Sequence, residues 1–238
     1  MKRCRNTPAA VQRQLRQEAH FGCCRCGHPL LDNAHIIPYS ISHAFPPEDM
    51  LALCPTCHRI ADDGDYSEKY LMELKANPRN KGSVSERFLI EGNDLILNIA
   101  GNRFINCATV LKINDYKIIT MKRESEGYVT LDLKLYDNNN NLIADVDENK
   151  WTINTSLVWD LEYKPRHLKI RNAPRQIYFD LRIENNQVFI EGNMYYLGEP
   201  IVMTGDDVQI ENSSVFGFMK GCTIQNAGTA INYRIIGK

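Results

Sequence analysis

Cysteine and histidine, two side chains that bind transition metals well, are concentrated near the start of the chain. Five of the six histidines precede residue 60, and the same region contains two Cys-x-x-Cys pairs, Cys23 with Cys26 and Cys54 with Cys57. Each pair can place two thiolates on one ion, and two pairs complete a tetrahedral structural Zn²⁺ site. We prefer Cys23 to its neighbour Cys24 because it matches the spacing of the second pair. Two matched pairs disfavour the alternative of ordinary buried cysteines or a single redox pair.

Further ligand-type side chains lie between and after the cysteine pairs. The segment AHIIP (34–38) contains His35, and HRIADDG begins with His58, directly after the second pair. With the cysteines, these motifs resemble the HNH nuclease superfamily, in members that read AHIIP…ALCPxCH…D-x-G, over roughly residues 8–76. The resemblance implies two β-strands and a helix around a metal. It also implies that His35 is the general base, that Asp49 replaces the asparagine bracing the loop of His35, and that His58 binds the catalytic metal.

The chain departs from the pattern of this superfamily at two positions. Many members carry Asp or His immediately before the general base as a second metal ligand, and here that position is Ala34. Members that read AHI commonly keep an acid later, and Asp62, four residues after His58, would share a helix face with it and could bind the same ion. A solvated helix carboxylate is the alternative for Asp62, and Asp32 is a weaker candidate ligand. The second departure is Asp49, which accepts hydrogen bonds but cannot donate through an amide.

The chemistry expected of these residues is metal-dependent hydrolysis of phosphodiester bonds in DNA, with RNA not excluded. Histidine titrates in the range that a general base needs, and Mg²⁺ or Mn²⁺ held by an imidazole and a carboxylate keeps positions open for water and phosphate. The alternative is a catalytically inactive, zinc-stapled module that binds nucleic acid or protein. Ala34 and Asp49 favour this alternative, whereas His35, His58 and Asp62 together favour the enzyme.

The element that precedes the first cysteine pair is a predicted helix over residues 9–20. Thr7 suits its N-cap and Pro8 its first position. Arg13 and Arg16 are three residues apart and share a face of this helix. A solvated basic face is the default interpretation of these arginines, and contact with phosphate is the functional one.

Two more helices are predicted in this part, one opening at 57–62 and one over 67–75. The polar stretch 77–83 contains proline and glycine and is interpreted as a linker. We therefore expect an α+β protein with an HNH nuclease domain over 1–82, including its basic N-terminal helix and linker. An all-β domain with mostly antiparallel strands is expected over 83–238.

The second domain is predicted from short alternating or β-branched segments separated by turn residues. These segments are residues 87–90, 94–99, 128–135, 157–163, 167–171, 176–183, 188–192 and 207–211. A faint internal repeat relates NCATVL (106–111) to NAGTAI (226–231). Regulation, target recognition, or contact with a second copy or a regulatory protein are the roles we expect for this domain.

Charge and hydropathy indicate where the protein is located and which partners it has. Residues 1–82 carry a net charge of +2 and the remainder −3, so the whole-chain balance of −1 does not itself indicate nucleic acid. No secretory signal or membrane-length apolar run is found, and we expect a cytoplasmic protein without membrane contact. A compact nuclease with an appended domain is similar in architecture to bacterial restriction or antiviral defence effectors, which is an analogy only.

Overall fold

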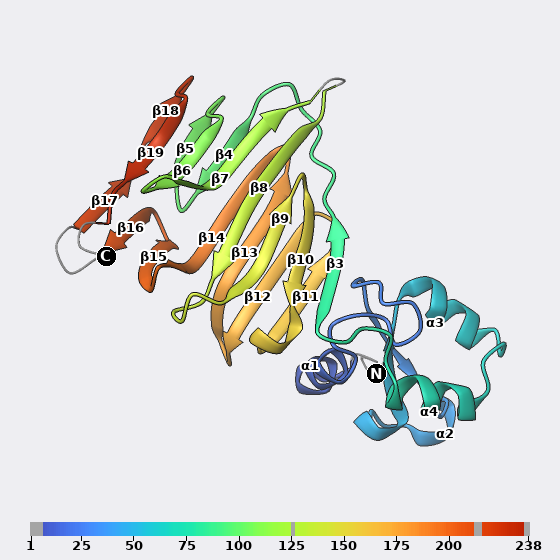
Figure 1. The fold of residues 1–238 in the computed structure, drawn as a ribbon. Helices are drawn as coiled ribbons and strands as arrows, with labels where there is room; N and C mark the ends of the chain where they lie inside the picture. Colours follow the sequence, from blue (N-terminus) through green and yellow to red (C-terminus); the bar gives the residue numbers. More distant parts are fainter. Residues whose placement is uncertain (1–6, 125–126, 212–215, 236–238) are drawn as a thin grey trace, which may run out of the picture.

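The computed structural model describes residues 7–124, 127–211 and 216–235 (Figure 1). The structure is mixed α+β and mostly β-strand, as predicted. All four α-helices found in these ranges precede residue 77, and one large β region follows residue 82. No helix within the described ranges has the length and apolar character needed to cross a membrane.

The described N-terminal part combines four α-helices and one short 3₁₀ helix with a two-stranded hairpin. Its elements are α1 (Ala9–Glu18), β1 (Asp32–His35), α2 (Tyr39–Ser42), η1 (Pro47–Asp49), β2 (Met50–Leu53), α3 (Pro55–Asp62) and α4 (Glu68–Ala76). β1 and β2 pair antiparallel, with Asp32 opposite Leu53 and His35 opposite Met50. All of β2 is buried, and α3 begins two residues after this strand ends. The hairpin and α3 therefore share one small apolar core, to which Leu15 and Leu71 also contribute.

Helix ends agree with the sequence patterns to within a few residues. α1 begins at Ala9 with Pro8 as its N-cap, so the N-cap predicted at Thr7 is wrong by one position. α4 has Ser67 as its N-cap, and the Ser67 hydroxyl accepts a hydrogen bond from the Tyr70 backbone N–H at 3.2 Å. Capping of this kind satisfies a backbone donor that has no partner inside the helix.

The β region contains seventeen strands in the described residues. They are β3 (Ser83–Arg87), β4 (Ile96–Ile99), β5 (Asn102–Ile105), β6 (Thr109–Ile113), β7 (Tyr116–Arg123), β8 (Val129–Tyr136), β9 (Leu142–Asp147), β10 (Lys150–Asn154), β11 (Asp160–Lys164), β12 (His167–Ala173), β13 (Gln176–Glu184), β14 (Gln187–Tyr196), β15 (Glu199–Thr204), β16 (Asp207–Glu211), β17 (Phe216–Lys220), β18 (Thr223–Gln225) and β19 (Thr229–Tyr233), with a short helix η2 (Thr155–Leu157) before β11.

Most of these strands pair with a neighbour in sequence and run antiparallel to it. One series is β3-β10-β9-β8-β7-β6, and another is β11-β12-β13-β14-β15-β16-β17. A single pair, Tyr195 with Tyr136, joins β14 to β8. Strands β8–β10 lie over β11–β14 (Figure 1), and the main apolar core, which includes Trp151 and Phe179, is shared by both series.

Three strand pairs depart from the antiparallel pattern. β4 pairs parallel with β14, β5 with β18, and β6 with β19. The last pair brings together the segments of the faint repeat, with Thr109 opposite Thr229 and Leu111 opposite Ile231. The two similar segments are therefore neighbouring strands of the sheet, and equivalent positions of the repeat lie opposite one another.

The basic residues of α1 contact the β region. Arg16 forms a two-pronged ion pair with Asp160, whose side chain is only 4% exposed. The Arg13 guanidinium lies 4.6 Å from the centre of the Trp159 ring, and the Gln17 amide donates to the Trp159 carbonyl at 2.6 Å. The solvated face expected for these arginines is wrong, because Arg16 binds Asp160 of β11 and Arg13 covers the residue before this strand. Contact with phosphate stays a prediction.

Candidate functional site

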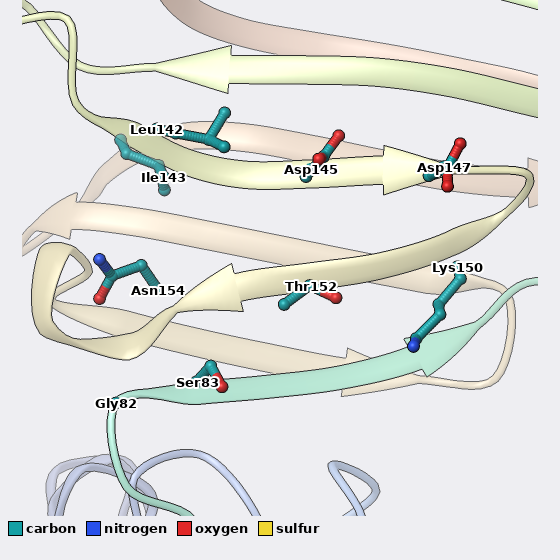
Figure 2. Close-up of a pocket in the computed structure, with 9 residues that line it drawn as sticks. All are labelled: Gly82, Ser83, Leu142, Ile143, Asp145, Asp147, Lys150, Thr152 and Asn154. Carbon is teal, nitrogen blue, oxygen red and sulfur yellow. The ribbon is translucent and has the colours of Figure 1, made fainter.

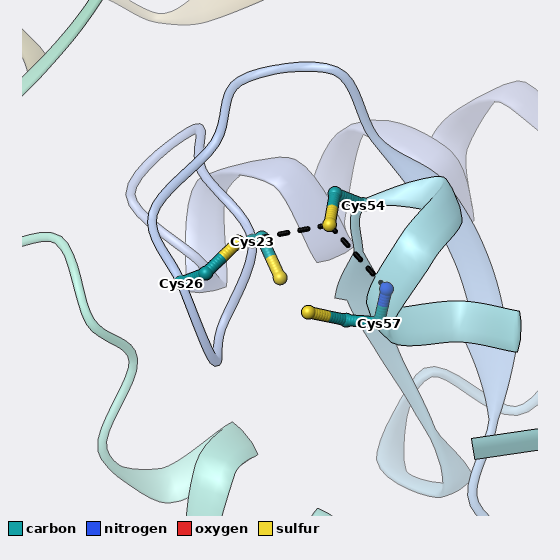
Figure 3. A group of neighbouring side chains, drawn as sticks. All are labelled: Cys23, Cys26, Cys54 and Cys57. Atoms are coloured by element: carbon teal, nitrogen blue, oxygen red, sulfur yellow. Dashed lines mark hydrogen bonds between the residues drawn. The ribbon is translucent and has the colours of Figure 1, made fainter. Parts of the chain in front are cut away.

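Four cysteines form the clearest metal-binding group of the described residues (Figure 3). The Sγ atoms of Cys23, Cys26, Cys54 and Cys57 all lie within 4.8 Å of one another. Four thiolates bonded to one Zn²⁺ at about 2.3 Å would be separated by about 3.8 Å, so the group needs little adjustment to bind an ion. Cys24 is not a member of the group, which agrees with the choice of Cys23 from the spacing.

Local structure explains how the second pair is presented. Cys54 is the N-cap of α3, and its sulfur accepts a hydrogen bond from the Cys57 backbone N–H at 3.5 Å. The first pair lies in the turns that follow α1, where the Gly27 N–H donates to the Cys23 carbonyl at 2.8 Å. A cation bound here would connect the start of α3 to the segment after α1.

The acidity of the thiols differs within the group. Burial raises the pKa of Cys23, but backbone hydrogen bonds at Cys26, Cys54 and Arg25 outweigh it and leave this pKa below its ordinary value. Burial raises the pKa of Cys57 and that of Cys26. The metal-free group therefore favours a thiolate at Cys23, and a bound dication would favour loss of the protons of Cys26 and Cys57.

Arg25, which lies between the two cysteines of the first pair, is a residue that the sequence reasoning missed. Its guanidinium donates to the Cys57 sulfur at 3.9 Å and lies 5.4 Å from the centre of the Tyr66 ring. A guanidinium beside the sulfurs offsets the negative charge that four thiolates would bring. Its position inside a Cys-x-x-Cys pair is the signal that could have identified it.

A pocket of about 450 Å³ brings together the other predicted site residues. His35 reaches it from β1, and His58 and Asp62 reach it from α3. Tyr39, Ile36, Pro38, Ala61, Gly64, Tyr66, Glu68 and Leu71 complete its lining. His35 is more than twenty residues from His58 and Asp62 in the sequence, and the three residues predicted to act together therefore line the same cavity.

The His35 ring is held by a carbonyl and by aromatic side chains. Its Nε2 lies 3.2 Å from the Ala44 carbonyl oxygen, and its ring centre lies 5.6 Å from that of Tyr39 and 5.5 Å from that of Phe45. A carbonyl can only accept, so Nε2 carries the proton when this hydrogen bond forms. In the neutral ring, Nδ1 then has a free lone pair, as a proton acceptor requires.

The His58 ring lies between two carboxylates. Its Nδ1 is 3.5 Å from Asp32 Oδ2, and its Nε2 is 3.6 Å from Asp62 Oδ1. Asp62 lines the pocket of about 450 Å³ and Asp32 does not. The neighbouring Asp63 does not face His58 and pairs with Arg59 at 3.1 Å.

His58 and Asp62 can supply only a few ligand atoms to a metal ion. Within the ranges that the structure describes, the four cysteines are the one group of three or more His, Cys, Asp or Glu side chains close enough to share an ion. His58 and Asp62 alone therefore supply two ligand atoms. Such a pair suits a cation that keeps most of its water, which is typical of Mg²⁺.

Asp49 is connected to the loop of His35 through its backbone. The Ile36 N–H donates to the Asp49 carbonyl at 2.8 Å, which extends the β1–β2 ladder by one bond beyond His35. Among the described residues, no hydrogen bond to the Asp49 carboxylate is found. Ala34, at the position where a second ligand was expected, is buried opposite Leu51.

A second pocket, of about 480 Å³, lies on strands β3, β9 and β10 (Figure 2). Ser83, Asp145, Asp147, Lys150 and Thr152 are among the residues that line it. Its lining offers carboxylates, an amine and hydroxyls but no imidazole or thiol. The pocket beside His35 is therefore the stronger candidate for a hydrolytic site.

Comparison with known proteins adds no family assignment. No protein-family model matches the chain, and neither a curated protein nor a solved structure matches it. The resemblance to HNH nucleases therefore stays a prediction from the motifs, and the function has to be argued from the geometry of the residues themselves.

Proposed function

We propose that this protein is a metal-dependent endonuclease of the HNH type that hydrolyses phosphodiester bonds in DNA. The observation that carries the proposal is the meeting of His35, His58 and Asp62 at one pocket of about 450 Å³. The hairpin β1–β2 and the helix α3 supply these residues, and the four-cysteine group lies at the start of the same helix.

In this proposal His35 is the general base. The hydrogen bond from its Nε2 to the Ala44 carbonyl and the rings of Tyr39 and Phe45 hold the imidazole in one orientation. Its Nδ1 can then accept a proton from the water that attacks phosphorus. A positioned base with a pKa near neutrality typically accelerates such a step by about 10²–10⁴-fold.

His58 and Asp62 would hold the catalytic Mg²⁺ or Mn²⁺. Such an ion offsets the negative charge of the phosphate and of the leaving oxygen. The two side chains lie on one face of α3 with 3.6 Å between His58 Nε2 and Asp62 Oδ1, so a small movement lets both reach one ion. Asp62 is 67% exposed, which leaves room for water and a phosphate group.

The four cysteines would hold a structural Zn²⁺ that keeps α3 and the segment after α1 together. In the same proposal, Asp49 supports the loop of His35 through its backbone carbonyl. The β region would recognise the target, bind a regulatory protein or contact a second copy of the chain. Restriction or antiviral defence is the setting that the architecture suggests by analogy.

Plasmid nicking with Mg²⁺, Mn²⁺ or Ni²⁺ tests the proposal. The wild-type protein should nick the plasmid, and His35→Asn should lose at least about 100-fold in rate because it lacks a base. His20→Asn is the matched control, since His20 is exposed and lies outside the pocket. A wild-type protein that is inert with all three metals contradicts the proposal.

The competing function is a zinc-stapled module that binds nucleic acid or protein without cutting. Buried Ala34 at the usual ligand position and the absence of a third nearby ligand among the described residues favour it. DNA binding that is retained without nicking, and that is equal in wild type and His35→Asn, would support this alternative.

A further inference from the structure

We propose that Asp32 is a positioning residue that orients His58 so that its Nε2 faces the catalytic metal. This inference rests on the proposed nuclease function and assigns a role in it to a residue outside the pocket. The sequence marks Asp32 only as a weaker candidate for a metal ligand.

The two ring nitrogens of His58 face different carboxylates. Nδ1 lies 3.5 Å from Asp32 Oδ2, and Nε2 lies 3.6 Å from Asp62 Oδ1. The nitrogens point away from one another across the imidazole ring, so a single ion can bond only one of them. One carboxylate can therefore bind the same ion as His58, and the other can only fix the orientation of the ring by a hydrogen bond.

The pocket decides between the two carboxylates. His58, Asp62 and His35 all line it, whereas Asp32 does not. An ion that is to act on the same phosphate as His35 must lie on the pocket side of the ring, where Nε2 faces Asp62. Asp32 therefore contacts Nδ1, the nitrogen on the other side of the ring.

A carboxylate at Nδ1 has a definite chemical effect. It accepts the Nδ1 proton, which leaves the Nε2 lone pair available to an ion, and it makes the imidazole a better donor. Asp32 and Ala34 lie on the same face of β1 because side chains alternate along a strand. Asp32 therefore stabilises the ligand His58 from the strand in which Ala34 offers no ligand of its own.

The test measures Mn²⁺ affinity by electron paramagnetic resonance on zinc-loaded protein. Asp62→Asn should lose binding at this site, because it removes a ligand. Asp32→Asn should bind Mn²⁺ about 10-fold more weakly, the lower end of the effect reported for partners of metal ligands. Asp63→Asn is the matched control, since this carboxylate pairs with Arg59 and should leave affinity unchanged.

A second measurement distinguishes a change in the orientation of His58 from general disruption of the site. Raising the Mn²⁺ concentration about 10-fold should restore plasmid nicking by Asp32→Asn, because only its metal affinity has changed, and should not restore nicking by Asp62→Asn.

If Asp32→Asn binds Mn²⁺ with the same affinity as Asp63→Asn, the role of Asp32 is refuted while the nuclease function stands. If Asp32→Asn abolishes binding and Asp62→Asn spares it, Asp32 is itself the ligand. If wild type binds no Mn²⁺, the proposed function fails, and the role of Asp32 fails with it.

Discussion

Arg16 of α1 and Asp160 of β11 form an ion pair in which the guanidinium Nη2 and Nε lie 2.7 and 3.0 Å from the two carboxylate oxygens. The residues are 144 positions apart, and the pair links the N-terminal part to the β region. Their side chains are only 16% and 4% exposed. Beside them, Arg13 covers the Trp159 ring. The arginine side chains of α1 thus serve as attachments between the two parts of the chain.

Removing one side of this pair should destabilise the protein. Arg16→Gln leaves the Asp160 carboxylate buried without its cation, and we expect a loss of about 2–3 kcal/mol in the free energy of unfolding. Urea denaturation measures this value. Arg59→Gln is the control, because its pair with Asp63 is exposed and should change stability by less than about 0.5 kcal/mol. An equal loss in the free energy of unfolding for the two variants would show that the buried pair stabilises the protein no more than the exposed one.

Zinc content should depend on the four clustered cysteines and not on their buried neighbour. Cys57→Ser should abolish tight zinc binding and unfold the N-terminal part, because the folding of such a small unit depends on its metal. Cys24→Ser should keep one zinc ion per chain, since Cys24 lies outside the group. Metal analysis by mass spectrometry, with circular dichroism of each variant, checks both outcomes. Loss of zinc from Cys24→Ser would contradict the assignment.

Zinc binding should release protons and strengthen as the pH rises. Burial raises the pKa of Cys57 and that of Cys26, so these thiols are protonated at neutral pH in the metal-free protein. Zinc binds thiolates, so it must displace these protons, and its affinity falls as the pH falls. Calorimetry at one pH in two buffers of different ionisation enthalpy measures the release. A binding enthalpy that does not depend on the buffer would contradict this expectation.

Gly192 in β14 should not tolerate a side chain. Its φ is 147°, and a Cβ there would lie 2.3 Å from the Tyr178 carbonyl oxygen and 2.8 Å from Phe179 Cα. Gly192→Ala must therefore shift the neighbouring strand, and we expect a loss of about 2 kcal/mol or more. Gly228→Ala is the control, because nothing lies within 4 Å of its Cβ position. Comparable denaturation midpoints for both variants would contradict the steric argument.

Local features of the chain were predictable because they depend on neighbours in sequence. Ser67 suits a helix N-cap because its side chain reaches the N–H of Tyr70, three residues later. The spacing of Cys54 and Cys57 suits a shared ion because the pair spans the first turn of a helix. The parallel pairing of β5 with β18 joins segments about 120 residues apart, and no local pattern distinguishes a parallel from an antiparallel partner.

The sequence by itself determined the cysteine group, the α+β character, some of the strands and the residues that could do chemistry, because residue types and short spacings encode these features. Only the tertiary structure decided that Arg13 contacts Trp159 and Arg16 contacts Asp160, since either solvent or phosphate would suit an exposed arginine equally well. It also decided which carboxylate faces each nitrogen of His58. That arrangement depends on how the β1–β2 hairpin packs against α3, and packing between elements is not encoded by the spacing within either one.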